Sequence, residues 1–251
     1  MHSLYTDFQK AFDSVCHEYL LIKMSNQFGI VGNNLSWFRS YLSDRFQRVV
    51  ISGIESDWAP VTSGVPQGSI LGPSLFLMFV NDIPPSLSSC ESLMFADDLK
   101  IFKRISSVND CVDLQFALNC LFSWCSKWKM TLNTEKCFYV NFSFKRAHNI
   151  EFDYMIDNCI LQPVKHIKDL GVHFSYNMCF SLHIASIVKK SFRMLGFVRR
   201  VLKPFKDVNV LKIMYNSYVR ANLDYCSSVW SPQSKYLIDK IERVQKVFVE
   251  E

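Results

Sequence analysis

The sequence predicts an α+β fold in two parts: an antiparallel sheet with packed helices over residues 1–175, and a mostly helical segment over residues 176–251. Two observations lead to this prediction. Short apolar runs bounded by turn signals lie in the first part, whereas apolar residues at helical spacing dominate the second. A content of 49% hydrophobic and 20% charged residues is typical of a globular chain.

The first part is organised around the stretch Phe95-Ala96-Asp97-Asp98. It lies between two short apolar runs, residues 93–94 and 99–102, which predict the strands of a tight hairpin. Two adjacent carboxylates repel each other, and a bound cation relieves the repulsion. Because the stretch holds no His or Cys, its oxygen ligands favour Mg²⁺, with Mn²⁺ as the alternative ion. A solvated turn is the simpler interpretation of this tetrapeptide taken alone.

Several elements are expected before this hairpin. Residues 1–7 form a short strand that ends at Asp7, and Asp13 or Ser14 then caps a helix that runs to about residue 28. Residues 35–42 form a second helix with a mostly buried aromatic face. Apolar and polar residues alternate over residues 46–52, which predicts a strand that turns back near Gly53.

The loop of residues 63–73 contains three glycines, among them Gly68, and leads into an apolar helix with Pro73 in its first turn. Gln67 in this loop carries both a hydrogen-bond donor and an acceptor in its side-chain amide. A Gly/Pro turn before a core helix is the structural alternative. Pro84-Pro85 is expected to end the helix.

Three elements are expected directly after the aspartate hairpin. Residues 108–128 carry apolar residues at helical spacing and should cross the back of the sheet. Lys136 follows at the next turn, where a solvated surface lysine is an equally good interpretation. Residues 138–144 and 152–161 are expected to be strands.

Charge is distributed unevenly along the second part. The net charge is only +5, yet no acidic residue lies between Asp169 and Asp207. Seven cations lie in that interval: Lys189, Lys190, Arg193, Arg199, Arg200, Lys203 and Lys206. They accompany a predicted helix over residues 180–202, followed by helices over 208–223 and 236–249. A charge run is usually a solvated face, but one without acids indicates phosphate contacts.

The composition argues against several classes of function. The nine cysteines form no C-x-x-C pair and the histidines lack zinc spacing, which argues against a metal–thiolate site. Without a secretory signal, reduced thiols in the nucleus or the cytoplasm are expected, and secretion is not. The longest apolar run, residues 70–80, is too short to span a bilayer, so no membrane partner is expected.

The motifs follow one another in a specific order: Tyr5 to Asp13, Ser63 to Pro73, Phe95 to Asp98, Leu132 to Lys136, and Leu170-Gly171-Val172. This series resembles the reverse transcriptases of non-LTR (LINE-type) retrotransposons, close to the jockey and CR1-like groups, from about Leu4 to the C-terminus. The resemblance implies a polymerase palm with a primer-grip hairpin over residues 1–175. It also implies a helical thumb with a C-terminal extension over residues 176–251.

The resemblance implies two-metal nucleotidyl transfer from a dNTP to a primer 3′-hydroxyl on an RNA template. Asp7 and Asp97 would hold the ions, with Asp98 completing the set. Lys136 would protonate the leaving pyrophosphate as a general acid. Phe12 would be the aromatic gate beneath the incoming sugar, and an ordinary core phenylalanine is the alternative.

The remaining roles concern binding of substrate, primer and template. Gln67 and Gly68 would contact the nucleotide, and Leu170 and Gly171 would hold the primer end. The thumb would contact the sugar–phosphate backbone along an RNA–DNA hybrid. The cations expected to do so are Lys189, Lys190, Arg193 and Arg200.

A second hypothesis belongs to a different class. Because the chain starts at the first catalytic motif, we expect the fingers of the family to be largely missing. The chain would then be a catalytically inactive retroelement remnant with at most weak nucleic-acid binding. A maturase or a viral RNA polymerase palm fits Ser63 to Gly68 and the C-terminal block less well.

Overall fold

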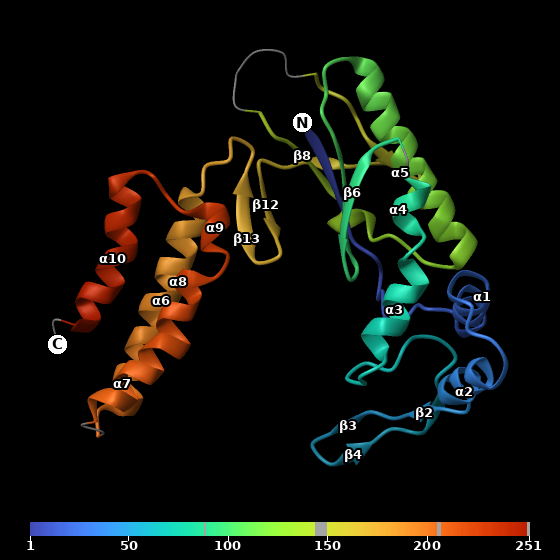
Figure 1. Ribbon diagram of the computed structural model, residues 1–251, viewed down its shortest axis with the longest axis horizontal. Helices are drawn as coiled ribbons and strands as arrows, with labels where there is room; N and C mark the ends of the chain where they lie inside the picture. The colour runs from blue at the N-terminus through green and yellow to red at the C-terminus, as the bar shows by residue number, and fades with distance from the viewer. Residues whose placement is uncertain (88, 144–149, 205–206, 250–251) are drawn as a thin grey trace. The chain divides into compact units, whose positions relative to one another are not determined.

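The computed structural model describes residues 1–87, 89–143, 150–204 and 207–249 (Figure 1). The chain forms two compact units, the first of residues 1–141 and 150–164 and the second of residues 142–143 and 165–249 within the described chain. The hairpin of residues 166–175, expected in the first part, belongs to the second unit because it packs on the C-terminal helices.

A five-stranded sheet with the order β11-β8-β1-β7-β6 lies at the centre of the first unit. Its strands are β1 (His2–Thr6), β6 (Glu91–Phe95), β7 (Asp98–Lys103), β8 (Phe138–Asn141) and β11 (Gln162–Pro163). The pairs β1–β7, β1–β8 and β6–β7 are antiparallel, but β11 runs parallel to β8. The sheet is therefore mixed, and the prediction of an antiparallel sheet is wrong at this edge. Between β8 and β11 the chain forms a hairpin of β9 (Met155–Ile156) and β10 (Cys159–Ile160).

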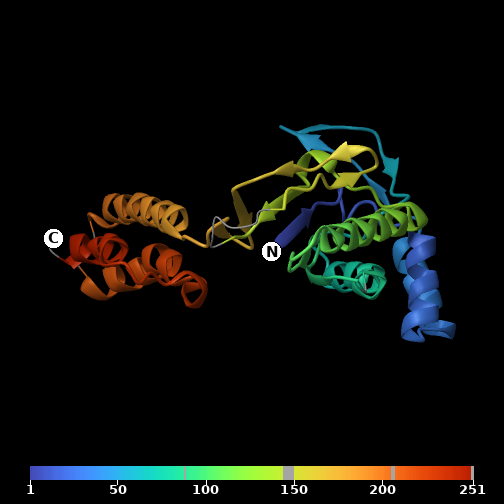
Figure 2. The same ribbon diagram turned by 90° about the horizontal axis from the view of Figure 1, so that it is seen from above.

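One face of this sheet is buried under helices. Leu4 and Ile101 are cross-strand partners and both are fully buried. The long helix α5 (Val108–Trp128) packs against β7 and adds Leu114 and Leu118 to the same core. Figure 2 shows α5 on the same side of the sheet as α3 and α4. The helix predicted over residues 108–128 is confirmed in both extent and position.

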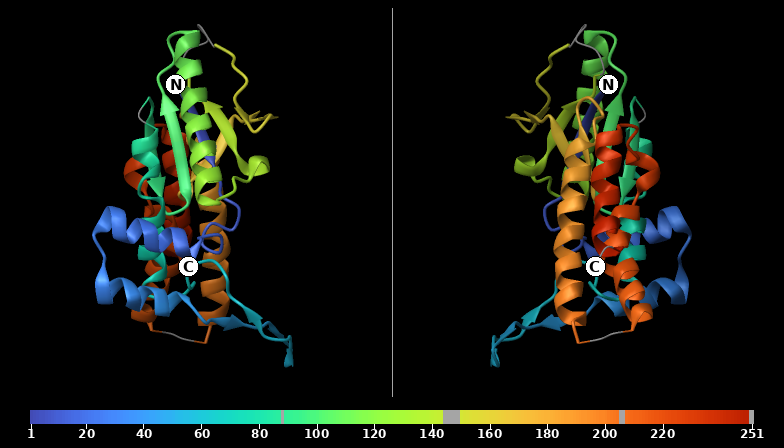
Figure 3. Two further views of the ribbon diagram at one scale, coloured as in Figure 1. Left: turned by 90° about the vertical axis from the view of Figure 1, so that its right-hand side faces the viewer. Right: turned by 90° about the vertical axis from the view of Figure 1, so that its left-hand side faces the viewer.

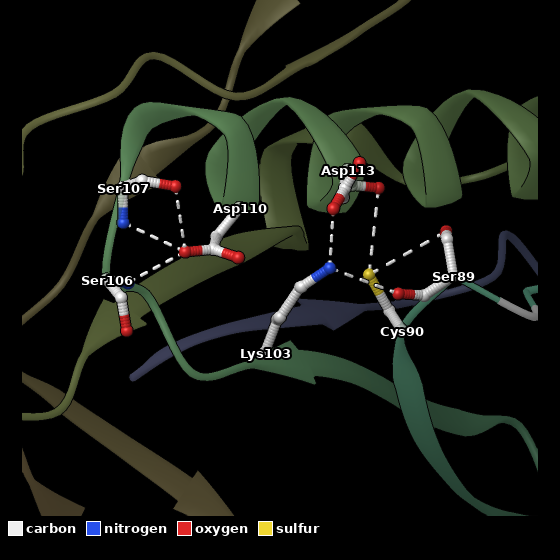
Figure 4. A network of polar contacts seen from close by, with 7 residues as sticks. All are labelled: Ser89, Cys90, Lys103, Ser106, Ser107, Asp110 and Asp113. Atoms are coloured by element: carbon white, nitrogen blue, oxygen red, sulfur yellow. Dashed lines mark hydrogen bonds and ion pairs between the residues drawn. The ribbon is translucent and has the colours of Figure 1, made fainter.

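Polar contacts fix the start of α5 to the end of β7 (Figure 4). Ser107 and Asp110 form a reciprocal capping box, and the Asp110 carboxylate also accepts from the Ser106 amide. These two backbone donors lower the pKa of Asp110. Lys103 at the end of β7 pairs with Asp113 one turn further along, at 2.6 Å. The first turn of α5 is thereby held against the sheet.

The two helices that follow β1 differ from the predictions in detail. Helix α1 (His17–Phe28) begins after Asp13 and Ser14, so neither residue caps it. The Ser14 hydroxyl instead donates to the carbonyls of residues 9 and 10, which closes the preceding turn. Helix α2 (Gly32–Leu42) buries its aromatic face only in part. Phe38 and Tyr41 are half-buried against the core, whereas Trp37 is 54% exposed and stacks on Tyr41.

An antiparallel arm follows α2 and projects from the first unit (Figure 3). It consists of two successive strand pairs, β2 (Phe46–Gln47) with β5 (Ala59–Pro60) and β3 (Val50–Ile51) with β4 (Ile54–Glu55). The pairing of Ile51 with Ile54 places the turn at Ser52-Gly53, close to the predicted position.

A second, short helix follows the apolar helix that comes after the arm. Helix α3 (Gly72–Val80) carries Pro73 in its first turn, as expected. Pro84 and Pro85 do not end this helix but form the first turn of the short helix α4 (Ile83–Ser86). A proline is well placed there because the first amides of a helix need no intrahelical acceptor.

The second unit combines one hairpin with several helices, and in Figure 3 α6 and α10 lie side by side. Its elements are β12 (His166–Asp169), β13 (Val172–Ser175), α6 (Ser181–Leu202), α7 (Val208–Met214), the π-helical segment η2 (Tyr215–Arg220), α8 (Ala221–Asp224), α9 (Ser227–Trp230) and α10 (Lys235–Val249). The predicted helices are confirmed, with α9 as an addition. Throughout the described ranges, no helix is long and apolar enough to cross a membrane.

Candidate active site

The sheet register brings the aspartate motifs to one end of the first unit. Thr6 at the end of β1 pairs with Leu99 of β7, so the next residue, Asp7, falls opposite Asp98. Thr6 and Leu99 lie on the buried face, and side chains alternate along strands. The side chains of Asp7 and Asp98 therefore share the open face. Asp97 occupies the adjoining turn between Phe95 and Asp98, which are themselves paired.

The segment of residues 131–137 fixes Asp7 from the other side. The Asp7 carbonyl accepts from the Asn133 amide at 2.8 Å, and the Asp7 amide donates to the Cys137 sulfur at 3.5 Å. Burial raises the pKa of the Cys137 thiol to about 11, so it remains a neutral packing group. The short 3-10 helix η1 (Thr134–Lys136) then presents Lys136, whose ammonium lies 3.8 Å from the Asp7 carboxylate.

The donor chemistry of this end of the sheet fits a hard cation. Asp7, Asp97 and Asp98 offer carboxylate oxygens. Among the residues that the structure describes, no group of three His, Cys, Asp or Glu side chains is arranged so that it could hold a metal ion by itself. Mg²⁺ usually keeps waters and binds through one or two carboxylates together with substrate phosphates, so it does not require three protein ligands.

The glycine-rich loop is tightly joined to the chain that follows Asp7. The Gly64 amide donates to the Val15 carbonyl at 2.8 Å, and the Val65 amide donates to the Phe12 carbonyl at 2.9 Å. A Cβ on Gly64 would meet the Asp13 backbone at 2.8 Å, and its φ is +91°. Only glycine therefore permits this approach.

This junction fixes the positions of the residues that are predicted to contact the nucleotide. Gln67 is exposed, and its side-chain amide donates to the Asp13 carboxylate at 2.8 Å. Phe12 is half-buried and stacks on Phe76 of α3, with ring centroids 4.3 Å apart. A cavity of about 760 Å³ lies beside Gln67, with Lys10 and Arg45 in its wall. Gly68 is exposed and lies directly after Gln67, with a positive φ.

The tip of the β12–β13 hairpin is fixed within the second unit. Leu170 and Gly171 form its two-residue turn with φ of +43° and +86°. The Tyr225 hydroxyl donates to the Leu170 carbonyl at 2.9 Å. The Tyr225 ring would touch a Cβ on Gly171 at 3.2 Å, so glycine is needed here as well.

Comparison with known proteins establishes the family of this chain. A profile described as reverse transcriptase (RNA-dependent DNA polymerase) matches residues 2–199. The chain belongs to this family. By family it is an RNA-directed DNA polymerase.

Curated relatives confirm the resemblance to jockey-type, non-LTR reverse transcriptases. The chain is 26% identical over 96% of its length to the RNA-directed DNA polymerase from mobile element jockey of Drosophila melanogaster. Its identity to the jockey polymerase of Drosophila funebris is 28% over 97% of the chain. This chain spans only 27% of the length of either relative.

Solved structures support the fold of this reverse transcriptase domain. The telomerase of Candida albicans in complex with a fragment of telomeric RNA matches 97% of the chain with a TM-score of 0.51, and the match covers 46% of that telomerase. The apo telomerase of Candida tropicalis matches 99% of the chain with a TM-score of 0.52, again over 46% of its own length. Sequence identities of 12% and 10% limit this likeness to the fold.

Helix α6 of the reverse transcriptase domain has one buried and one basic face. Ile184, Leu195 and Val198 face the core, while the four predicted cations Lys189, Lys190, Arg193 and Arg200 are all exposed. Arg199 is half-buried and donates to the Val247 carbonyl of α10, so it serves packing. Lys206 lies outside the described residues.

Two features of the site were not predicted from the sequence. One is the pairing of Asp13 with Gln67, which only the folded loop brings together. The other is Tyr225, to which no role was assigned. No sequence pattern around Tyr225 predicts a contact with residue 170, more than fifty positions earlier.

Proposed function

We propose that this domain catalyses RNA-directed DNA synthesis by two-metal nucleotidyl transfer from a dNTP to a primer 3′-hydroxyl. The observation that carries the proposal is the β1–β7 register, which aligns Asp7 with the Asp97-Asp98 turn on the open face of the sheet. Carboxylates from two segments far apart in the sequence thus lie at one end of the sheet, where Lys136 pairs with Asp7, and such a gathering of charged groups is typical of functional sites.

The aspartates would hold the divalent ions. Asp7 and Asp97 are the proposed shared ligands, with Asp98 in support. Mg²⁺ held by these residues would supply charge neutralisation for the phosphates and would favour ionisation of the attacking hydroxyl. The Lys136 side chain pairs with Asp7 at 3.8 Å and is the proposed proton donor to the leaving pyrophosphate.

The cavity beside Gln67 is the proposed nucleotide site. The Lys10 and Arg45 side chains in its wall supply positive charge for a triphosphate. The Phe12 ring cannot easily move aside because it stacks on Phe76. A fixed ring at the sugar would clash with a 2′-hydroxyl and thereby favour deoxynucleotides.

Metal binding and synthesis test the proposal together. Mn²⁺ should broaden the amide resonances of residues near Asp7 and Asp97 in nuclear magnetic resonance (NMR) spectra of the chain. Asp97→Asn should weaken this effect at both positions because the ligands are shared. Primer extension on an RNA template should fall by roughly 10³-fold or more in the same variant, since catalysis depends on the ions.

Asp113→Asn serves as the matched control. It removes the same charge from the same unit. The Asp113 carboxylate pairs with Lys103, which lies at the opposite end of β7 from Asp98. It should leave Mn²⁺ broadening at Asp7 unchanged. Broadening at Asp7 that persists in Asp97→Asn would contradict a shared metal site. Metal binding and hybrid binding without Asp97-dependent synthesis would instead favour an inactive remnant.

A further inference from the structure

The Asp13 carboxylate lies in the wall of the cavity beside Gln67, together with Lys10 and Arg45. A negative charge in a site for a triphosphate opposes the binding of phosphate groups, so its presence there requires another reason. Within the described chain, neither Lys10 nor Arg45 forms an ion pair with Asp13. The side-chain partner of the carboxylate is the Gln67 amide, at 2.8 Å. Asp13 therefore acts on Gln67 and does not serve as a counter-charge for the two cations.

The backbone of Asp13 is fixed from two segments. Its amide donates to the Lys10 carbonyl at 2.9 Å, which belongs to the turn after β1. Its carbonyl accepts from the Ser63 hydroxyl at 2.9 Å, and Gly64 approaches it so closely that a Cβ there would meet the Asp13 Cα at 2.8 Å. The carboxylate is thus an acceptor whose position is set before any ligand binds.

This fixed acceptor determines which end of the Gln67 amide faces it. An ionised carboxylate accepts hydrogen bonds and donates none, so only the Nε2 end of the amide can face Asp13. The Oε1 end then points away from Asp13, and none of the described residues donates to it. Without Asp13, the exposed side chain could present either end, because the two ends of an amide have nearly the same shape.

A free acceptor at Gln67 restricts the part of a nucleotide that it can bind. Phosphate oxygens carry no hydrogen to donate, so the triphosphate is left to Lys10 and Arg45. Amino groups on the bases differ among the four nucleotides, whereas a polymerase that copies any template must accept all four. The sugar hydroxyl is a donor common to all four deoxynucleotides. Phe12, the proposed neighbour of the sugar, directly precedes Asp13, and its carbonyl accepts from the Val65 amide at 2.9 Å.

We infer that Asp13 is a positioning residue that fixes the orientation of the Gln67 amide, so that Gln67 accepts a hydrogen bond from the sugar hydroxyl of the incoming nucleotide. The inference rests on the proposed function and deepens it, since it adds a determinant of substrate selection to the same cavity. Asp13 acts only through Gln67. A change at Asp13 should therefore alter discrimination by the sugar hydroxyl and have no effect where Gln67 is absent.

Equilibrium binding of dTTP and of its dideoxy analogue, which lacks the sugar hydroxyl, tests the inference in the full chain. The backbone amide signal of Gly68 in NMR spectra reports binding and is retained in every variant. The unmodified chain should bind dTTP roughly fivefold more tightly than the analogue, the effect of one neutral hydrogen bond. Asp13→Asn should bring this ratio close to one by weakening dTTP alone, because an Asn amide can face either end of Gln67. Gln67→Leu should do the same.

Asp44→Asn is the matched control. Asp44 is exposed and lies outside the cavity wall, and Asn tolerates its φ of +54°. This variant loses the same charge next to Arg45 and should keep the fivefold ratio. The double variant Asp13→Asn, Gln67→Leu should behave as Gln67→Leu alone, because Asp13 acts through Gln67.

Three results would overturn the inference: equal binding of both nucleotides by the unmodified chain, no binding of dTTP at Gly68, or equal weakening of both nucleotides by Asp13→Asn. The last would show that Asp13 only supports the fold of the loop. None of these measurements requires synthesis. Failure of the proposed function would appear separately, as Mn²⁺ broadening and synthesis that do not respond to Asp97→Asn.

Discussion

At the scale of single residues, His2 couples the stability of the first unit to pH. The ring is 2% exposed on β1, its Nδ1 lies 2.8 Å from the Tyr154 hydroxyl, and it packs against Tyr139. Burial, with a smaller contribution from the terminal amine, lowers the pKa of His2 from 6.5 to about 4. The folded unit therefore holds His2 neutral at a pH where the unfolded chain protonates it.

We expect this unit to lose stability as the pH falls from 6.5 to 4. Over that interval His2 binds a proton in the unfolded chain but not in the folded unit. The free energy of unfolding therefore falls by about 3 kcal/mol. Urea unfolding at several pH values measures the change. His2→Leu should flatten the dependence by this amount, whatever its own effect on stability. An equally steep dependence in that variant would assign the proton uptake to other groups.

At the scale of elements, the β12–β13 turn depends on Tyr225. Gly171→Ala adds a Cβ both at a φ of +86° and within 3.2 Å of the Tyr225 ring. It should destabilise the second unit by about 1–3 kcal/mol. In Tyr225→Leu the contact is absent, so the same Gly171→Ala change should cost less. A double-mutant cycle by urea unfolding isolates the difference. Additive effects would show that backbone strain alone determines the requirement for glycine.

The elements also show where sequence patterns succeed. Helices α5 and α6 were predicted closely because each keeps an apolar face over more than twenty residues. The N-terminal cap of α1 and the burial of the aromatic face of α2 were predicted less well, because tertiary contacts determine the conformation of such short segments. Trp37 stacks on Tyr41 at the surface, and Ser14 closes a turn. The parallel edge strand β11 has two residues and carries no pattern that sets its direction.

Candidate site residues divide in the same way. The order of motifs predicts Asp7, Asp97 and Lys136 as candidates. In the fold, Asp7 follows β1 beside the β6–β7 turn that contains Asp97, and it pairs with Lys136. No periodicity predicts that His183 is buried at 2% exposure with its Nε2 lacking a hydrogen-bond partner among the described residues. Lys23 was likewise unforeseen. It is 1% exposed, pairs with Asp82 at 2.6 Å and lies 4.0 Å from the Trp128 ring.

At the scale of the whole molecule, each unit has its own hydrophobic core, and each carries a different part of the proposed function. The carboxylates and the nucleotide cavity lie in the first unit, and the basic surface of α6 lies in the second. Nucleic-acid affinity and catalysis should therefore be separable by mutation. Variants in α6 should change binding without altering Mn²⁺ broadening at Asp7.

Salt dependence tests this separation most directly. Binding of an RNA–DNA hybrid should weaken steeply as salt increases, because each phosphate contact releases counterions. The triple variant Lys190→Ala, Arg193→Ala and Arg200→Ala should lower the log–log slope by roughly 2–3, close to one for each lost contact. Lys212→Ala, Lys235→Ala and Lys246→Ala remove three exposed cations from α7 and α10 and match the change in net charge. If the α6 cations contact phosphates, this control keeps the original slope. Equal slopes for both triple variants would mean that α6 is only a solvated face and that net charge alone attracts the hybrid.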